Sequence, residues 1–264
     1  SNWLETKMLP LANKIAKQKY LKAISNTFMS IIPFMTIGSI ALVLVSPVAN
    51  SADLEPGLFK SFIEAWEMVA EMIALPVGSI YTICMECIAI FVAAGIGYFL
   101  SQHYKMKGFT PTILSVISFL ILGGLNGGFE KVWTYAGGTG LFTAIFSSIL
   151  SIELLHFLVE KKFGKISLEG HGVPEALTES FAMLFPCVVV LLVVSLLHTV
   201  VSTVTGSAFP ALMQVIMSPL LSATNSIFGG VILVFLVMTL WWFGIHDTAI
   251  TGPMGAFWAV ALSA

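Results

Sequence analysis

The charged positions of this chain are gathered into short stretches that separate long stretches without charge. The longest uncharged stretch runs from Ser180 to His246 and contains no Lys, Arg, Asp or Glu. A soluble domain needs charged faces toward water, whereas a charged side chain in hydrocarbon costs several kcal/mol. As a single helix this stretch would extend roughly 100 Å, several times the ~30 Å thickness of a bilayer core. We therefore expect an integral membrane protein whose chain folds back on itself.

Intervals of helical length, uncharged except for Glu86 and Glu153, mark the expected crossings, which cover residues 23–52, 72–104, 109–124, 140–159, 180–205 and 228–246. Residues 206–226 contain several helix breakers, so we interpret them as an interfacial or re-entrant connection. Residues 1–20 combine lysines with apolar side chains at helical spacing, which is typical of an amphipathic helix on the membrane surface. The pattern predicts an all-α, polytopic membrane protein with about six transmembrane helices in this portion.

The lysines fall on alternate connections between the expected spans. One set of connections carries only Lys60 and Lys131, together with six acidic residues, while the other set carries ten lysines. Cytoplasmic loops have an excess of positive charge, so the N-terminus is predicted to be cytoplasmic. Residues 51–71 and 126–139 are then expected outside. The ten lysines of the cytoplasmic set are Lys7, Lys14, Lys17, Lys19, Lys22, Lys105, Lys107, Lys161, Lys162 and Lys165.

The composition supports a membrane protein and excludes several other classes. Hydrophobic residues make up 57% of the chain, charged residues 10%, and the mean hydropathy is +0.95. A net charge of −2 and the lack of a basic, aromatic-rich patch give no indication of a nucleic-acid partner. Cys84 and Cys87 have CxxC spacing without a second pair, so they are expected to be buried packing residues. No motif for a metal or another cofactor is recognisable, and we predict none.

Several polar residues within or beside the spans admit two interpretations. Intramembrane acids are functional by default, so Glu86, Glu153 and Glu179 are candidate proton or ion sites. The alternative, favoured for Glu153 and Glu179, places these carboxylates near helix ends where they reach headgroups or water. His198 lies deep in the fifth span and is expected to be a hydrogen-bonded packing residue. The small residues 93–97 are expected to permit close helix packing.

The polar pair His246-Asp247 differs from these residues because it follows the aromatic sequence Trp241-Trp242-Phe243 directly. Imidazole and carboxylate groups suit sugar hydroxyls, while the rings of Trp241 and Trp242 suit the apolar face of a pyranose. Gly244 would let the backbone approach a ligand closely. The other interpretation is an aromatic belt at the lipid interface with a His-Asp pair facing headgroups. The residues alone weigh the two about evenly.

Four separated motifs together extend over nearly the whole chain. They are the amphipathic start Trp3-Leu4-Glu5 through Met8-Leu9-Pro10; Tyr20-Leu21-Lys22-Ala23-Ile24 with Ile31-Ile32-Pro33; Gly172-Val173-Pro174-Glu175-Ala176 with Ser180-Phe181-Ala182 and Pro186; and Trp242-Phe243-Gly244-Ile245-His246. In these motifs the chain resembles the EIIC membrane subunit of the phosphoenolpyruvate-dependent sugar phosphotransferase system. The resemblance is to its lactose, cellobiose and N,N′-diacetylchitobiose branch. The last motif is the most specific, because it is similar to the family's histidine-bearing substrate segment.

The resemblance implies a homodimeric, multi-pass sugar permease of the bacterial inner membrane that works by group translocation. A β-linked disaccharide of the diacetylchitobiose or cellobiose type would bind from outside. The phosphocysteine of a cytoplasmic EIIB subunit, supplied indirectly by EIIA, would then phosphorylate it. This chain would be the membrane subunit of a multicomponent phosphotransferase, without a phosphoryl donor of its own. His246 would act as a base or an orienting group, with Asp247, Trp242 and Gly244 as further substrate-binding residues.

Two features depart from the family pattern. Relatives often have Gly at the position of Asp247, which bears on sugar preference, and they continue beyond the position of Ala264 into a glutamate-bearing substrate motif. We therefore expect the rest of the binding site beyond Ala264. The expected divisions are the amphipathic segment 1–20, dimerising transmembrane helices in 21–179, and helices leading into a truncated substrate region in 180–264. An ion-coupled secondary sugar transporter is the alternative function, with Glu86 and Glu153 as its candidate coupling sites.

Overall fold

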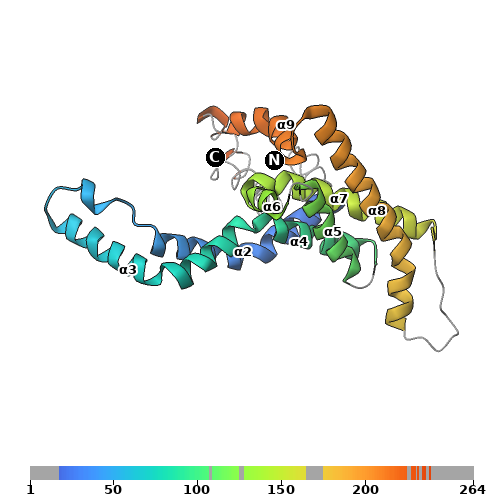
Figure 1. Ribbon diagram of the computed structural model, residues 1–264, viewed down its shortest axis with the longest axis horizontal. Coiled ribbons are helices and arrows are strands. Elements are labelled where there is room, and N and C mark those ends of the chain that lie inside the picture. The colour runs from blue at the N-terminus through green and yellow to red at the C-terminus, as the bar shows by residue number, and fades with distance from the viewer. Residues whose placement is uncertain are drawn as a thin grey trace, which may run out of the picture. The chain divides into compact units, whose positions relative to one another are not determined.

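The computed structural model describes residues 18–106, 109–124, 128–164 and 175–224, together with 227–229, 231, 234–235 and 238. Regular structure within these residues is entirely helical, which confirms the all-α prediction (Figure 1). The α-helices are α2 (Lys19–Val45), α3 (Leu58–Tyr81), α4 (Ile88–His103), α5 (Thr110–Leu122), α6 (Phe129–Thr134), α7 (Leu141–Glu160), α8 (Glu175–Thr205) and α9 (Phe209–Thr224). Short 3₁₀ turns η2 (Ser51–Asp53) and η5 (Gly138–Gly140) and a π-helical segment η3 (Thr82–Glu86) connect some of them.

Four of the described helical segments are long and apolar enough to cross a membrane, namely Lys19–Val45, Leu58–Glu86, Gly138–Glu160 and Phe181–Thr205. Three shorter apolar helices are Ile88–His103, Thr110–Leu122 and Phe209–Ser218. Because about 20 apolar helical residues span a bilayer core, these segments confirm an integral membrane protein. The predicted spans 23–52, 109–124, 140–159 and 180–205 correspond to α2, α5, α7 and α8.

The second predicted span and the loop before it differ from the structure. The acidic segment 51–71 was expected to be an exterior loop, but its residues from Leu58 onward form the first half of α3. Glutamate, methionine and alanine are good helix formers, so these charges do not interrupt the helix. The single span predicted over residues 72–104 is divided by η3, after which α4 begins.

The segment 206–226 is also more regular than the sequence suggested, because most of it forms α9. Pro210 lies in the first turn of that helix, where a missing N–H removes no intrahelical hydrogen bond. A helix of 16 residues extends about 24 Å, which is shorter than a bilayer core. A connection that does not cross the membrane completely remains the interpretation of this segment.

The described chain forms two compact units, and the smaller one, Ile31–Ile88, is a helical hairpin. It consists of the second part of α2 and of α3 with η3. The backbone N–H of Ser51 donates to Oε1 of Glu67 at 2.9 Å, which fastens the turn of the hairpin to α3. The two arms touch at Gly38, where an added Cβ would lie only 2.8 Å from the Cβ of Cys84. This unit is therefore held by local contacts between two long helices.

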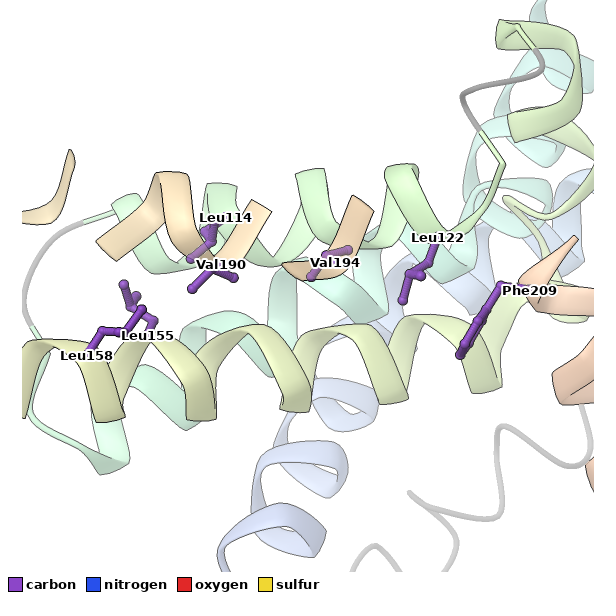
Figure 2. Packing of buried hydrophobic residues seen from close by; sticks show 7 residues of the cluster. All are labelled: Leu114, Leu122, Leu155, Leu158, Val190, Val194 and Phe209. Atoms are coloured by element: carbon purple, nitrogen blue, oxygen red, sulfur yellow. The ribbon is translucent and has the colours of Figure 1, made fainter. Parts of the chain in front are cut away.

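The larger unit contains the remaining described residues and is organised around α5, α7 and α8. Figure 2 shows its apolar core, in which Leu114 lies near Leu155 and Leu158 at one end, and Leu122 lies near Phe209 at the other. Phe209 of α9 also stacks on Phe146, near the start of α7, with 5.4 Å between ring centroids, so α5 and α7 run in opposite directions. The seven buried residues of this core are Leu114, Leu122, Leu155, Leu158, Val190, Val194 and Phe209.

Glycines of α4 bring neighbouring helices into close contact within this unit. A Cβ added at Gly95 would lie 2.4 Å from Cγ2 of Thr27 in α2. At Gly97 it would lie 2.5 Å from the Cβ of Ser115 in α5. The expectation that residues 93–97 permit close helix approach agrees with these contacts. They are made within one chain, so this stretch does not by itself call for a second copy.

Serine hydroxyls pair with the backbone at the same level of α4. Ser115 of α5 and Ser148 of α7 both donate to the carbonyl oxygen of Ala93, at 2.7 and 3.3 Å. The hydroxyl of Ser148 also lies 2.6 Å from the carbonyl of Ala144 in its own helix, so its proton is shared between two acceptors. Three helices therefore meet at one backbone carbonyl.

We predict that Gly97→Ala destabilises the protein by about 1–3 kcal/mol, because the new methyl group would overlap Ser115 and crowd the backbone of Thr112, 3.3 Å away. Thermal unfolding in detergent measures this. Gly78→Ala is the matched control, since a Cβ at Gly78 in α3 has no neighbour within 4 Å. The control should be neutral or stabilising by up to about 1 kcal/mol, because alanine is the better helix former. Equal unfolding temperatures for the two variants would contradict the close contact.

Candidate functional site

The residues predicted to bind sugar, Trp242, Gly244, His246 and Asp247, lie outside the described residues. Their roles therefore stay predictions. Glu179 falls within the described helix α8. The candidate sites that can be built from contacts belong to the lysine-rich side of the larger unit and to α8.

Glu153 forms the centre of a polar cluster that joins three helices. Its Oε1 accepts a hydrogen bond from Nζ of Lys19, the first residue of α2, at 2.9 Å. The same oxygen accepts a hydrogen bond from the hydroxyl of Tyr104, which directly follows α4, at 2.5 Å. Nζ of Lys19 also donates to the Tyr104 hydroxyl oxygen, so the three side chains form a closed triangle.

Aromatic rings border this triangle. The ring of His156, one turn along α7 from Glu153, stacks on Tyr104 with 3.8 Å between centroids and 13° between planes. Nζ of Lys19 lies 4.6 Å from the ring centroid of Tyr20, within range of a cation–π attraction. Partial burial and the hydrogen bond to Glu153 raise the pKa of Tyr104, so its hydroxyl stays protonated and able to donate.

The cluster therefore answers the question left open for Glu153. The side chains of Lys19 and Glu153 are each 30% exposed, and the lysine charge balances the carboxylate. A carboxylate with a fixed cation and a fixed hydroxyl donor is a structural tie between helices rather than an open ion site. The sequence suggested a coupling site or a carboxylate that reaches headgroups or water, and it predicted neither partner of Glu153.

The sequence held the signal for this cluster, although the contact itself was missed. The expected topology already placed Lys19, the end of the second span and the end of the fourth span on the same lysine-rich side. A tyrosine and a glutamate at two of those ends are natural partners for the lysine. Which ends touch depends on how the helices pack, and hydropathy does not specify that.

Two other polar candidates have different surroundings. Glu86 is exposed at the end of the π-helical segment η3. His198 is only 6% exposed in α8, and its Nδ1 has no hydrogen-bond partner among the described residues. His198 was expected to be a hydrogen-bonded packing residue. Within the described part of the chain, its Nδ1 does not make that hydrogen bond.

The described residues contain no group of three or more His, Cys, Asp or Glu side chains able to hold a metal ion. Cys87 is buried, and Cys84 and Cys187 are half-buried; all three are free thiols. Burial of Cys87 agrees with the packing role expected for the CxxC pair.

We predict that Tyr104→Phe destabilises the protein by about 1 kcal/mol, because it removes the hydroxyl from the triangle while keeping the ring that stacks on His156. Thermal unfolding in detergent is the measurement, and Tyr98→Phe on the exposed face of α4 is the matched control. Lys19→Met should lower the free energy of unfolding less in the Tyr104→Phe variant than in the native protein. The reason is that the three groups form one network, which Tyr104→Phe has already weakened. Strictly additive effects would show that they act independently.

Comparisons with known proteins agree with this architecture. The family described as "Phosphotransferase system, EIIC" matches residues 25–263. The cellobiose-specific EIIC component of Geobacillus stearothermophilus is 30% identical over 97% of this chain and 57% of its own length. The oligo-beta-mannoside-specific EIIC component of Bacillus subtilis (strain 168) is 27% identical over 95% of this chain and 56% of its own length.

A solved structure shows the same fold. The transporter ChbC, the IIC component from the N,N′-diacetylchitobiose-specific phosphotransferase system, has a TM-score of 0.81 and 29% sequence identity. The match covers 97% of this chain and 60% of that one, so this chain spans less than two thirds of the length of these relatives. The resemblance inferred from the four sequence motifs is confirmed. The chain belongs to the EIIC family of the phosphotransferase system.

Proposed function

We propose that this chain forms part of a permease that binds a β-linked disaccharide and presents it for phosphorylation during uptake. The observation that carries the proposal is the fold similarity to ChbC, a diacetylchitobiose-system component, over 97% of the chain. Relatives named for cellobiose and for oligo-beta-mannosides support the same substrate class, because these sugars are β-linked and rich in equatorial hydroxyls. Cellobiose and diacetylchitobiose are the substrates to test first.

The proposed reaction is phosphoryl transfer from a phosphocysteine on a cytoplasmic EIIB subunit, charged through EIIA, to a hydroxyl of the bound sugar. The P–S bond breaks and leaves the EIIB cysteine as a thiolate, a P–O bond forms, and the proton of the hydroxyl passes to His246 or to the departing thiolate. In this scheme His246 lies at the sugar hydroxyl, either accepting that proton or holding the hydroxyl by a hydrogen bond. Trp242 would pack on the sugar ring, while Asp247 and the backbone at Gly244 would complete the contacts.

An ion-coupled secondary transporter lacks comparable support. Its coupling site would need a carboxylate free to exchange a proton or a cation. Glu153, one of the two candidates, is already bound to Lys19 and Tyr104. The relatives are phosphotransferase components, and a coupled transporter would release unmodified sugar inside the cell.

A homodimer is part of the proposal because the family resemblance implies it. Independent support from the small residues 93–97 is weaker than the sequence suggested, since Gly95 and Gly97 already pack against Thr27 and Ser115 of the same chain. The exposed apolar side chains of α3 face either lipid or a second copy.

We predict that His246→Ala weakens disaccharide binding by roughly ten- to a hundredfold, because a buried sugar hydroxyl would lose its partner. Calorimetric titration of the purified full-length protein with cellobiose and with diacetylchitobiose measures this. His103→Ala is the matched control, since His103 is exposed at the end of α4, on the lysine-rich side. Binding by the His246 variant that equals that of the control would remove this residue from the site and favour the aromatic-belt interpretation.

The proposed orientation predicts that the hairpin turn near Asp53 is outside and that Lys161 after α7 is inside. Each position is replaced singly by cysteine in a background in which Cys84, Cys87 and Cys187 are serine. A membrane-impermeant maleimide should label position 53 in intact cells and position 161 only after permeabilisation. Both positions are at exposed connections, so accessibility reports the side of the membrane. Labelling in the reverse order would invert the topology.

A further inference from the structure

Helix α7 ends in a backbone conformation that usually requires glycine. The N–H of Lys162 donates to the carbonyl of Val159 at 2.9 Å, and the N–H of Phe163 donates to that of Leu158 at 2.9 Å. These two bonds define a Schellman motif, in which the residue corresponding to Lys162 adopts the left-handed conformation and is most often Gly. Lys162 has a φ of 54°. A lysine therefore occupies a position that disfavours its side chain.

Helix α4 ends in the same way at Lys105. The N–H of Lys105 donates to Gln102 and that of Met106 to Ser101, both at 3.0 Å, and the φ of Lys105 is also 54°. Within the described residues, these two lysines are the only non-glycine residues with positive φ. Both follow helices that end on the lysine-rich side. A residue held in a sparsely populated conformation is a reason to look for a function at its position.

A recess of about 230 Å³ lies beside Lys162, between the end of α7 and the start of α8. Among the residues that the structure describes, the lining apart from the lysine is apolar and consists of Val159, Phe163, Ala182, Met183 and Pro186. The turn is pressed against α8, because a Cβ added at Gly164 would lie 2.6 Å from the Cβ of Phe185. The neighbouring Lys161 is placed differently, because its Nζ lies over the ring of Phe157, 6.0 Å from the ring centroid. Lys162 is among the residues that line the recess, whereas Lys161 is not.

The recess crosses the expected boundary between hydrocarbon and headgroups. Val159 belongs to the candidate span Gly138–Glu160, and Ala182, Met183 and Pro186 belong to the span Phe181–Thr205. Lys162 follows the end of the first of these spans. A pocket with apolar walls at membrane depth and a cation at its rim matches an amphiphile with an anionic head.

We propose that this recess is a binding site for an anionic phospholipid. The phosphate pairs with the ammonium group of Lys162, and part of an acyl chain lies against Met183 and Pro186. A protein partner approaching from water would meet the apolar walls only by entering the hydrocarbon, whereas a lipid reaches them from within the bilayer. The site is independent of the sugar-binding proposal.

Native mass spectrometry of the delipidated, purified protein titrated with phosphatidylglycerol, and separately with phosphatidylcholine of the same acyl chains, tests this. The native protein should bind phosphatidylglycerol more tightly. Lys162→Gln should lower the affinity for phosphatidylglycerol about fivefold, the effect of one lysine near an anionic lipid, and leave phosphatidylcholine binding unchanged. Lys105→Gln is the matched control, because Lys105 has the same backbone conformation but does not line the recess.

A second variant tests the apolar part of the site without changing charge. Ala182→Leu should fill the recess and weaken phosphatidylglycerol binding, with thermal unfolding confirming that the variant is folded. Unchanged phosphatidylglycerol affinity in Lys162→Gln would overturn the proposal, as would equal losses in Lys162→Gln and Lys105→Gln, which would mean nonspecific attraction to charge. Lipid affinity retained by both site variants, with weaker binding of a cytoplasmic partner domain, would instead assign the recess to a protein.

Discussion

Close backbone approach around Ala93 is the constraint on which the larger unit depends. In a bilayer, apolar side chains gain little by leaving lipid for protein, so helix association rests on tight contact and on pairing of polar groups. Gly95 and Gly97 remove the side chains that would hold α4 away from α2 and α5. The hydroxyls of Ser115 and Ser148 then reach the same carbonyl from two different helices. The apolar core of α5, α7 and α8 is built beside this junction.

The elements that could be predicted are those whose limits the bilayer imposes. The positions of α2, α5, α7 and α8 could be predicted from stretches with few or no charges. Each charged residue within hydrocarbon is costly, so the sequence itself shows where a span must end. The same rule did not predict the first half of α3, because residues 51–71 were expected to be an exterior connection between two spans. Charge argues against burial in lipid and does not argue against helical backbone, as Glu64, Glu67 and Glu71 within α3 show.

The polar sites were harder to predict because they depend on contacts between distant residues. Glu153 had two interpretations from sequence, and its actual partners, Lys19 and Tyr104, are 134 and 49 residues away along the chain. Hydropathy places all three at one membrane face but does not say which helix ends meet. The histidine-bearing substrate segment was recognised by resemblance to a family, and its chemistry stays a prediction because it lies outside the described residues.

Several helices of the larger unit are followed by a residue with a positive φ, and the type of residue differs between the two sides of the unit. Gly124 follows α5 and Gly206 follows α8, whereas Lys105 and Lys162 follow the oppositely directed α4 and α7. A left-handed residue with a side chain costs roughly 1–2 kcal/mol. A cation near a helix C-terminus recovers about 0.3–1 kcal/mol through the helix dipole, which leaves part of that cost. Attraction to an anionic group contributes about 1 kcal/mol per lysine, which is comparable in size with the cost that remains. A left-handed lysine therefore costs least where an anionic group lies near its ammonium, and of these two lysines Lys162 is the one that lines a recess suited to such a group.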